Sequence, residues 1–185
     1  GTSPTFQNFM GGDLQGILDH LPYLKELGIN AIYTTPIFSA RSNHKYDTAD
    51  YFKIDPAFGD LELFKQLVRT AHDNGIRIIM DAVFNHCGDG FWAFQDVISR
   101  GNDSQYRDWF VMSSLPIVED PPNYQTCGGA GFLPKLNVEN PQVRSYLLEV
   151  AVYWLRETGM DGWRLDVPWK ISLEFWREFR QAVKS

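Results

Sequence analysis

The sequence has few cysteines, no long apolar run and no cluster of basic residues. Its two cysteines, Cys87 and Cys127, form neither a CxxC pair nor a zinc-binding spacing, so a disulfide framework is excluded and only a single bridge is left open. No stretch of about 18 or more apolar residues occurs, which excludes a transmembrane helix. The 185 residues, 44% of them apolar, can still bury one substantial core, so we expect a globular protein.

Acidic residues outnumber basic ones by 23 to 17, which gives a formal net charge of -6. Such a chain does not attract polyphosphate backbones or anionic lipid, so neither nucleic acid nor membrane is expected as a partner. Aromatic residues make up 15% of the chain and include six tryptophans and eight tyrosines. These rings can fill a core, or they can stack against an amphipathic ligand such as a sugar.

The chain opens with Gly1 and has no initiator methionine, so we expect its natural start to lie further upstream. The absence of a visible signal peptide then says little about location. The location is unknown from the sequence, and a cytoplasmic one is the preferred expectation.

Helical and strand-like segments alternate along the chain. Helices are expected near residues 11–28, 60–75, 140–159 and 173–183, and buried strands at residues 29–37, 76–84 and 162–167. Asp13, Asp60 and Asn140 stand where N-caps are expected, and Pro141 follows at the first helical position.

This alternation predicts an α/β protein with parallel strands joined by helices, either a doubly wound sheet or part of a TIM (β/α)8 barrel. Three strands cannot close a barrel, which usually takes about 250 residues. Residues 88–140 show no clear period and are too long for a simple connection, which predicts an inserted lid or small subdomain. The expected parts are therefore residues 1–87, 88–140 and 141–185, of which the first and last belong to the barrel.

Polar side chains follow the expected strands, where parallel α/β proteins place their active sites. Asp81, Asn85 and His86 crowd the end of one strand. Arg164 and Asp166 lie two positions apart on another, so their side chains should project to the same side and the arginine should keep the carboxylate ionised. The alternative is an ordinary buried Arg-Asp ion pair that only holds the strands together. Taken alone, His86 could be a metal ligand, a donor to substrate or a satisfied core histidine.

Four ordered segments resemble motifs of the α-amylase superfamily, closest to the neopullulanase and cyclomaltodextrinase type. They are Asp81-Ala-Val-Phe-Asn-His86, Gly162-Trp-Arg-Leu-Asp-Val167, Leu133-Pro-Lys-Leu-Asn137, and the stretch from His44 to Tyr51 with Ile54-Asp-Pro-Ala-Phe-Gly59. The resemblance covers residues 11–185. Several motifs in order and at compatible spacing are far more specific than any one of them.

The resemblance implies a retaining glycoside hydrolase that cleaves α-1,4 glucosidic bonds, with α-1,6 bonds as a further option. Its substrates would be maltooligosaccharides, cyclodextrins, starch or pullulan. Asp166 is then the nucleophile that forms a β-glycosyl intermediate, and Arg164 keeps it ionised and oriented. His86 would hydrogen-bond the sugar on the non-reducing side of the cleaved bond, while Tyr46 would stack beneath that ring.

The same resemblance assigns supporting roles to two more residues. Asp81 is expected to organise the substrate site, and Asn85 matches a position that ligates calcium in many α-amylases. That use of calcium is not uniform in the neopullulanase group, so calcium is a weak expectation and no cofactor is required. The parent protein is expected to be a homo-oligomer that binds α-glucan oligosaccharides.

One part of the family's machinery has no counterpart among these residues. Retaining glycosidases need a second carboxyl group as acid/base, and in the family it is a glutamate on the fifth barrel strand. Glu174 and Glu178 lie on the last expected helix and are not accepted as substitutes. We therefore expect the 185 residues alone to be inactive. The segment from Pro168 to Lys170 also departs from many relatives, which leaves acceptor-side specificity open.

Two other functions compete with a hydrolase. One is a carbohydrate-binding fragment without catalysis that keeps Tyr46 and His86 for contact with sugar. The other is a metal-dependent barrel hydrolase using Asp81 and His86, which is disfavoured because the sequence contains no HxH pair.

Overall fold

A three-stranded parallel sheet forms the centre of the computed structural model, which describes residue 3 and residues 5–185. Its strands are β1 (Ala31–Tyr33), β4 (Arg77–Ala82) and β5 (Gly162–Leu165), in the order β1-β4-β5. Both neighbouring pairs are parallel, with Ile32 opposite Ile78 and Met80 opposite Trp163. The expected parallel α/β arrangement is therefore present, because each strand joins the next through a helix.

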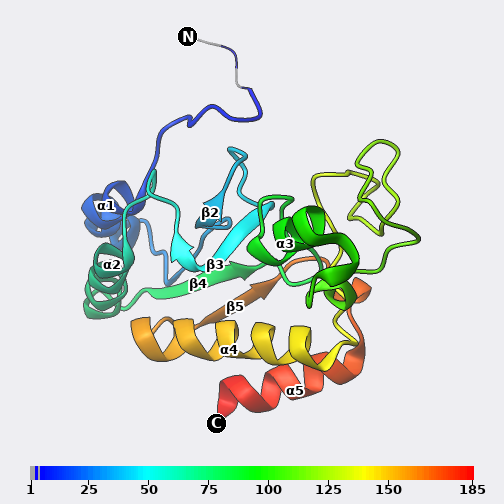
Figure 1. Cartoon of the computed structure of the whole chain (residues 1–185). Coiled ribbons are helices and arrows are strands. Elements are labelled where there is room, and N and C mark those ends of the chain that lie inside the picture. The colour runs from blue at the N-terminus through cyan, green and yellow to red at the C-terminus, as the bar shows by residue number, and fades with distance from the viewer. Residues whose placement is uncertain (1–2, 4) are drawn as a thin grey trace.

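Four helices pack beside the sheet in chain order (Figure 1). They are α1 (Leu14–Glu26), α2 (Leu61–Asp73), α4 (Pro141–Thr158) and α5 (Leu173–Lys184). α1 contacts α2, α2 contacts α4, and α4 contacts α5. Sequential strands with right-handed crossovers place successive helices on one face, so this arrangement matches the start of a barrel's outer ring.

The helices begin where the sequence places their caps. The Asp13 carboxylate accepts a hydrogen bond from the Gly16 amide at 2.7 Å, and Asp60 caps α2 in the same way through the Leu63 amide at 2.9 Å. Asn140 accepts from the Gln142 amide at 2.8 Å. Each side chain satisfies a backbone donor that has no partner inside the helix, which confirms the predicted starts.

An antiparallel hairpin between β1 and α2 was not expected from the sequence. It consists of β2 (Phe38–Ala40) and β3 (Thr48–Ile54), and β1 is correspondingly shorter than the predicted strand at residues 29–37. The buried residues of β3 are Thr48, Tyr51 and Ile54, which recur every three positions rather than every two. Register shifts in the β2/β3 pairing cause this spacing, so the alternation that predicts a strand is lost.

Aromatic side chains fill the core between the hairpin, the sheet and α4. Phe38 and Trp154 lie 5.1 Å apart between ring centroids, and the Trp154 indole donates to the Tyr51 carbonyl at 2.8 Å. The single proton of the buried Tyr51 hydroxyl is shared between the carbonyls of Val83 and His86, which lie 2.8 and 2.9 Å from the hydroxyl oxygen. The hairpin therefore holds the backbone that follows β4 in a fixed position.

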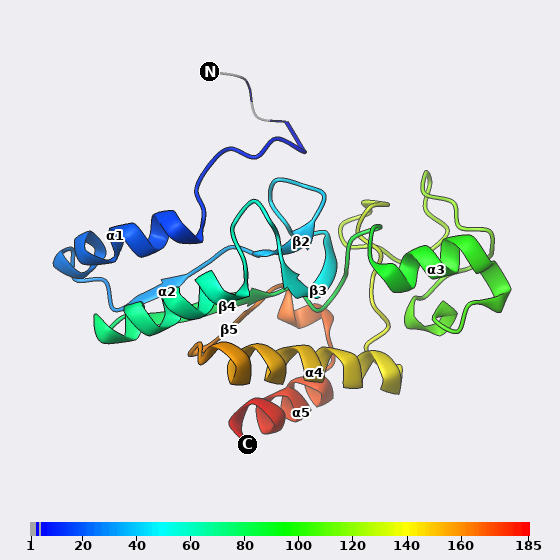
Figure 2. The same cartoon turned by 60° about the vertical axis from the view of Figure 1, so that its left-hand side comes forward.

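Residues 88–140 lie at the carboxyl end of β4 and contain α3 (Trp92–Arg100) with two short 3-10 turns, η1 (Gly101–Asp103) and η2 (Arg107–Trp109) (Figure 2). The segment returns to the strand end through backbone hydrogen bonds. The Leu136 amide donates to the Asn85 carbonyl at 3.0 Å, and the Cys87 amide donates to the Pro134 carbonyl at 3.1 Å. Its function as a lid or subdomain remains a prediction.

Both cysteines carry free thiols, so the single bridge left open by the sequence is not formed. Cys87 is buried, and burial raises the pKa of its thiol. Among the helices that the structure describes, none combines the length and apolar character needed to cross a membrane.

Candidate active site

The ends of β4 and β5 bring Asp81, Arg164 and Asp166 together. Asp81 and Arg164 are direct partners in the strand register, and Asp166 follows two residues after the arginine. Arg164 Nη1 donates to both Asp81 carboxylate oxygens, at 3.1 and 3.0 Å, and to Asp166 Oδ1 at 2.8 Å. One guanidinium therefore links two carboxylates from neighbouring strands. Burial acts to lower the pKa of Arg164, but the hydrogen bonds and charge of Asp81 outweigh it and raise that pKa.

The Asp81 side chain is fully buried, with 0% of its surface exposed. Its Oδ2 atom accepts from the hydroxyls of Tyr33 at 2.9 Å and Tyr46 at 3.1 Å, in addition to Arg164. Burial raises the pKa of Asp81, while the hydrogen bonds from Tyr33 and Arg164 act in the opposite direction. With its oxygens occupied by three donors, Asp81 ties β1, the β2/β3 loop and β5 together.

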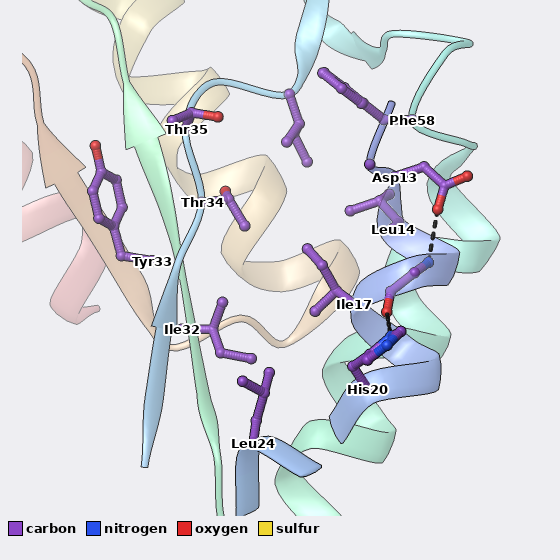
Figure 3. A pocket seen from close by; sticks show the side chains of 13 residues that line it. Asp13, Leu14, Ile17, His20, Leu24, Ile32, Tyr33, Thr34, Thr35 and Phe58 are labelled. Carbon is purple, nitrogen blue, oxygen red and sulfur yellow. Dashed lines mark hydrogen bonds between the residues drawn. The ribbon is translucent and has the colours of Figure 1, made fainter. Parts of the chain in front are cut away.

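Tyr33 belongs to this site, although it was not predicted from the sequence. It ends β1, and Figure 3 shows its ring on the opposite face of the strand from Ile32 and Thr34, which point towards α1. A tyrosine at the carboxyl end of a strand, out of phase with the apolar residues that face a helix, is the signal that could have identified it. Burial and the bond to Asp81 raise the pKa of Tyr33, so its hydroxyl remains a donor.

Tyr46 is held by a tightly bonded turn between β2 and β3. Lys45 adopts a left-handed backbone conformation with φ 64°, and its ammonium lies 2.7 Å from Asp55 Oδ2, with each side chain 10% exposed. Lys45 Nζ also donates to the Ala40 carbonyl at 3.0 Å. Burial acts to raise the pKa of Asp55, but the Lys45 ammonium and nearby amides lower it overall. This buried ion pair fixes the turn. At Tyr46 itself, burial of the phenol raises its pKa.

Asp166 differs from Asp81 in that one of its oxygens is not engaged by Arg164. Its side chain is 12% exposed, and among the described residues its carboxylate accepts a hydrogen bond only from Arg164. Val167, which follows it, has φ 38°, a left-handed conformation that is costly for a β-branched residue. The chain therefore turns sharply away immediately after Asp166, and Trp169 in the next turn, η3 (Pro168–Lys170), is 78% exposed.

His86 and Asn85 lie beside this cluster but form no side-chain hydrogen bond with it among the described residues. His86 is 2% exposed, and the Asn85 amide donates to its Nδ1 at 3.2 Å. Nε2 then carries the proton of the neutral ring, and this buried atom has no partner in the described chain. Burial lowers the pKa of His86 to about 4, although the nearby charge of Asp166 acts to raise it. An orphaned buried donor is costly, so it points to an acceptor on a ligand.

The buried His86 should make folding sensitive to acid. Its pKa is about 4 in the folded state against an ordinary value of 6.5, so the unfolded chain binds more protons between these values. The free energy of unfolding should therefore fall on acidification from about pH 7 to about pH 4, with His86 contributing up to roughly 3 kcal/mol. Urea unfolding across this range should show that His86→Gln loses this part of the pH dependence. His20→Gln, on the exposed side of α1, is the control, and equal pH dependence in both variants would contradict the assignment.

Among the described residues, Asn85 offers one oxygen atom of a kind that calcium binds. Asn85 Oδ1 is buried without a hydrogen-bond partner, and an amide oxygen is a suitable calcium ligand. Calcium needs six to eight oxygen ligands, yet no group of three or more His, Cys, Asp or Glu side chains suited to a metal occurs in the described part of the chain.

Two further features border the cluster, and the first shares only Tyr33 with it. A pocket of about 530 Å³ opens between α1 and β1, lined by residues such as Ile17, Leu24 and Ile32, and it contains none of the predicted site residues (Figure 3). Glu178 of α5 forms an ion pair with Arg144 of α4 at 2.8 Å.

Known proteins share the sequence and the fold of this chain. A family model described as the catalytic domain of alpha amylase matches residues 3–181. A cyclomaltodextrinase from Geobacillus thermopakistaniensis is 59% identical over 183 residues, which cover 98% of this chain and 31% of that protein. Neopullulanase 2 from Thermoactinomyces vulgaris is 54% identical over 184 residues, with the same two shares.

A solved structure shows that the similarity extends to the three-dimensional fold. Cyclic α-maltosyl-(1→6)-maltose hydrolase from Arthrobacter globiformis, in complex with the sugar of that name, matches with a TM-score of 0.96 and 55% identity, covering 100% of this chain and 42% of that one. The chain thus spans about a third of the length of the curated relatives it matches. These matches confirm the partial barrel and the predicted resemblance: this chain belongs to the α-amylase catalytic-domain family.

Proposed function

We propose that these residues supply the nucleophile half of the active site in a retaining α-glucan hydrolase. The observation that carries the proposal is the linked pair Arg164 and Asp166, in which one carboxylate oxygen is held and the other is left open at the strand ends. By full-length enzyme we mean these residues within a chain of the relatives' length.

The geometry suits a double displacement. The free oxygen of Asp166 attacks the anomeric carbon, the glycosidic bond breaks, and the leaving oxygen takes a proton from an acid that these residues do not supply. Water then attacks the glycosyl-enzyme ester, gives its proton to the same acid group, and releases the sugar with Asp166 restored. Arg164 holds the carboxylate in position, and His86 donates its Nε2 proton to a sugar hydroxyl. The aromatic ring of Tyr46 stacks against the same sugar.

The named activities of the relatives define the substrate class. They are cyclomaltodextrinase, maltogenic amylase and neopullulanase, and one solved relative was determined with maltose. We therefore propose α-glucan oligosaccharides with α-1,4 bonds, and in some cases α-1,6 bonds, as substrates. A homo-oligomeric state, calcium binding and a cytoplasmic location are proposed from the sequence alone.

The proposal predicts which glycosidic bonds the full-length enzyme cleaves. It should release reducing sugar from maltotriose, β-cyclodextrin and pullulan, because the named activities of the relatives are on α-linked glucans. The β-linked analogue cellotriose is the control, since it has the same sugar units and the opposite linkage. Cleavage of cellotriose at a rate similar to maltotriose, or no cleavage of any α-glucan, would contradict the proposed function.

A further inference from the structure

A second pocket lies between the inserted segment and α4, and it shares no residue with the cluster at the strand ends. Its volume is about 510 Å³, within the range of about 300–1,000 Å³ typical of small-molecule sites. It is lined by Trp92, Gln105, Tyr106, Trp109, Pro141, Gln142, Ser145, Tyr146 and Glu149. Trp92 begins α3, while the last five come from the first half of α4 (Figure 2).

Four aromatic rings form the wall of this pocket. The Trp92 ring lies 4.7 Å from Tyr106 and 5.5 Å from Trp109, while Trp109 lies 5.5 Å from Tyr146. A cluster that served only as core would be covered, but the Trp92 side chain is 40% exposed. These features together indicate a surface that a ligand completes.

Hydrogen bonds hold the wall in place and leave polar groups for a ligand. The Trp109 indole donates to Gln142 Oε1 at 3.0 Å, and Gln105 Nε2 donates to the Tyr106 hydroxyl at 2.8 Å. The amide nitrogen of Gln142 and the carbonyl of Gln105 remain available on these exposed side chains. Ser145 and Glu149 are exposed on the same rim and form no side-chain hydrogen bond or ion pair within the described residues.

The chemistry of the lining selects the ligand. It contains no cationic side chain and one carboxylate, so it does not suit an anion. Aromatic rings beside amide, hydroxyl and carboxylate groups suit a neutral molecule with an apolar face and a hydroxylated edge, as in a pyranose ring. We propose that this pocket is a second glucan-binding site that holds polymeric substrate away from the catalytic cluster. The choice of a glucan rests on the proposed function of the active site.

The test compares variants of the full-length enzyme by retention in native gels containing soluble starch and by kinetics on maltotriose and starch. Trp92→Ala should weaken starch retention by about tenfold, because it removes the exposed stacking face. Ser145→Leu, at an exposed position on α4, narrows the pocket without touching the aromatic wall and should weaken retention as well. Both variants should hydrolyse maltotriose at the wild-type rate, with kcat/KM lowered on starch alone. Tyr23→Ala removes an aromatic side chain that is 59% exposed on α1 and serves as the matched control.

The outcomes separate this site from the proposed function. Unchanged starch retention in both variants, with normal hydrolysis of maltotriose, would overturn the second site and leave the hydrolase intact. Retention that is lost in Trp92→Ala while the wild-type enzyme hydrolyses no α-glucan would support the site and contradict the hydrolase. Equal loss of retention in Tyr23→Ala would show that the effect does not belong to this pocket, and would also overturn the proposal.

Discussion

Replacing Asp166 with asparagine in the full-length enzyme should lower kcat on maltotriose by roughly 10⁴-fold or more. The amide keeps the shape of the side chain but cannot form the glycosyl ester, so the covalent route is lost. The affinity for maltotriose should stay within a few-fold of wild type. The substitution does not change the hydrogen bond proposed from His86 or the stacking surface proposed on Tyr46. Steady-state kinetics together with calorimetric binding separates these two effects.

The matched control for this substitution is Asp161→Asn. Asp161 precedes the same strand, β5, but it lies at the opposite end and accepts hydrogen bonds from the Ile78 amide and the His72 ring, each at 2.8 Å. Its loss should affect stability and leave kcat close to wild type. Turnover by Asp166→Asn comparable to that of the Asp161→Asn control would remove Asp166 from the mechanism.

A polypeptide consisting of residues 1–185 alone should show no turnover of maltotriose, β-cyclodextrin or pullulan. Cleavage needs a proton donor for the leaving oxygen, and general acid catalysis alone supplies about 10² to 10⁴ in rate. Asp81 is the carboxyl group bound to the same guanidinium as Asp166, but it is fully buried and accepts from Tyr33, Tyr46 and Arg164. It therefore cannot reach a glycosidic oxygen.

The assay is release of reducing sugar by the purified 185-residue polypeptide, with the full-length enzyme as control and circular dichroism to establish that the polypeptide is folded. Open edges at β1 and β5 leave backbone groups unpaired, so the folded polypeptide should also tend to associate. Turnover within about a hundredfold of the full-length enzyme would mean that an acid is present within residues 1–185. If Asp81→Asn then abolished that turnover, Asp81 would be the acid and the incomplete-site account would be wrong.

Features that depend on local chemistry were predictable from the sequence. Asp13 and Asp60 were identifiable as caps because a helix start needs a side-chain acceptor a few residues away in the chain. The common side of Arg164 and Asp166 follows from the alternation of a strand, and the structure joins them at 2.8 Å. The roles of these residues in catalysis came from the family resemblance and remain to be tested.

Features that depend on distant contacts were not predictable in the same way. Tyr33 meets Asp81 across 48 residues of sequence, and no local pattern connects the two. The hairpin that holds Tyr46 was missed because its register shifts remove the alternation of a regular strand. The left-handed backbone at Val167 depends on the loop that follows β5. A valine on its own predicts an extended backbone with negative φ.

The central claim is that Asp166 forms a covalent bond to the sugar, and mass spectrometry of a trapped intermediate tests it most directly. A fluorinated α-maltosyl fluoride carries a good leaving group, which removes the need for an acid in the first step, while its ring fluorine slows hydrolysis of the ester. The full-length enzyme treated with this reagent should gain one glycosyl group, located by peptide sequencing on Asp166. A label on any other residue, or no label while the enzyme hydrolyses maltotriose normally, would contradict the account.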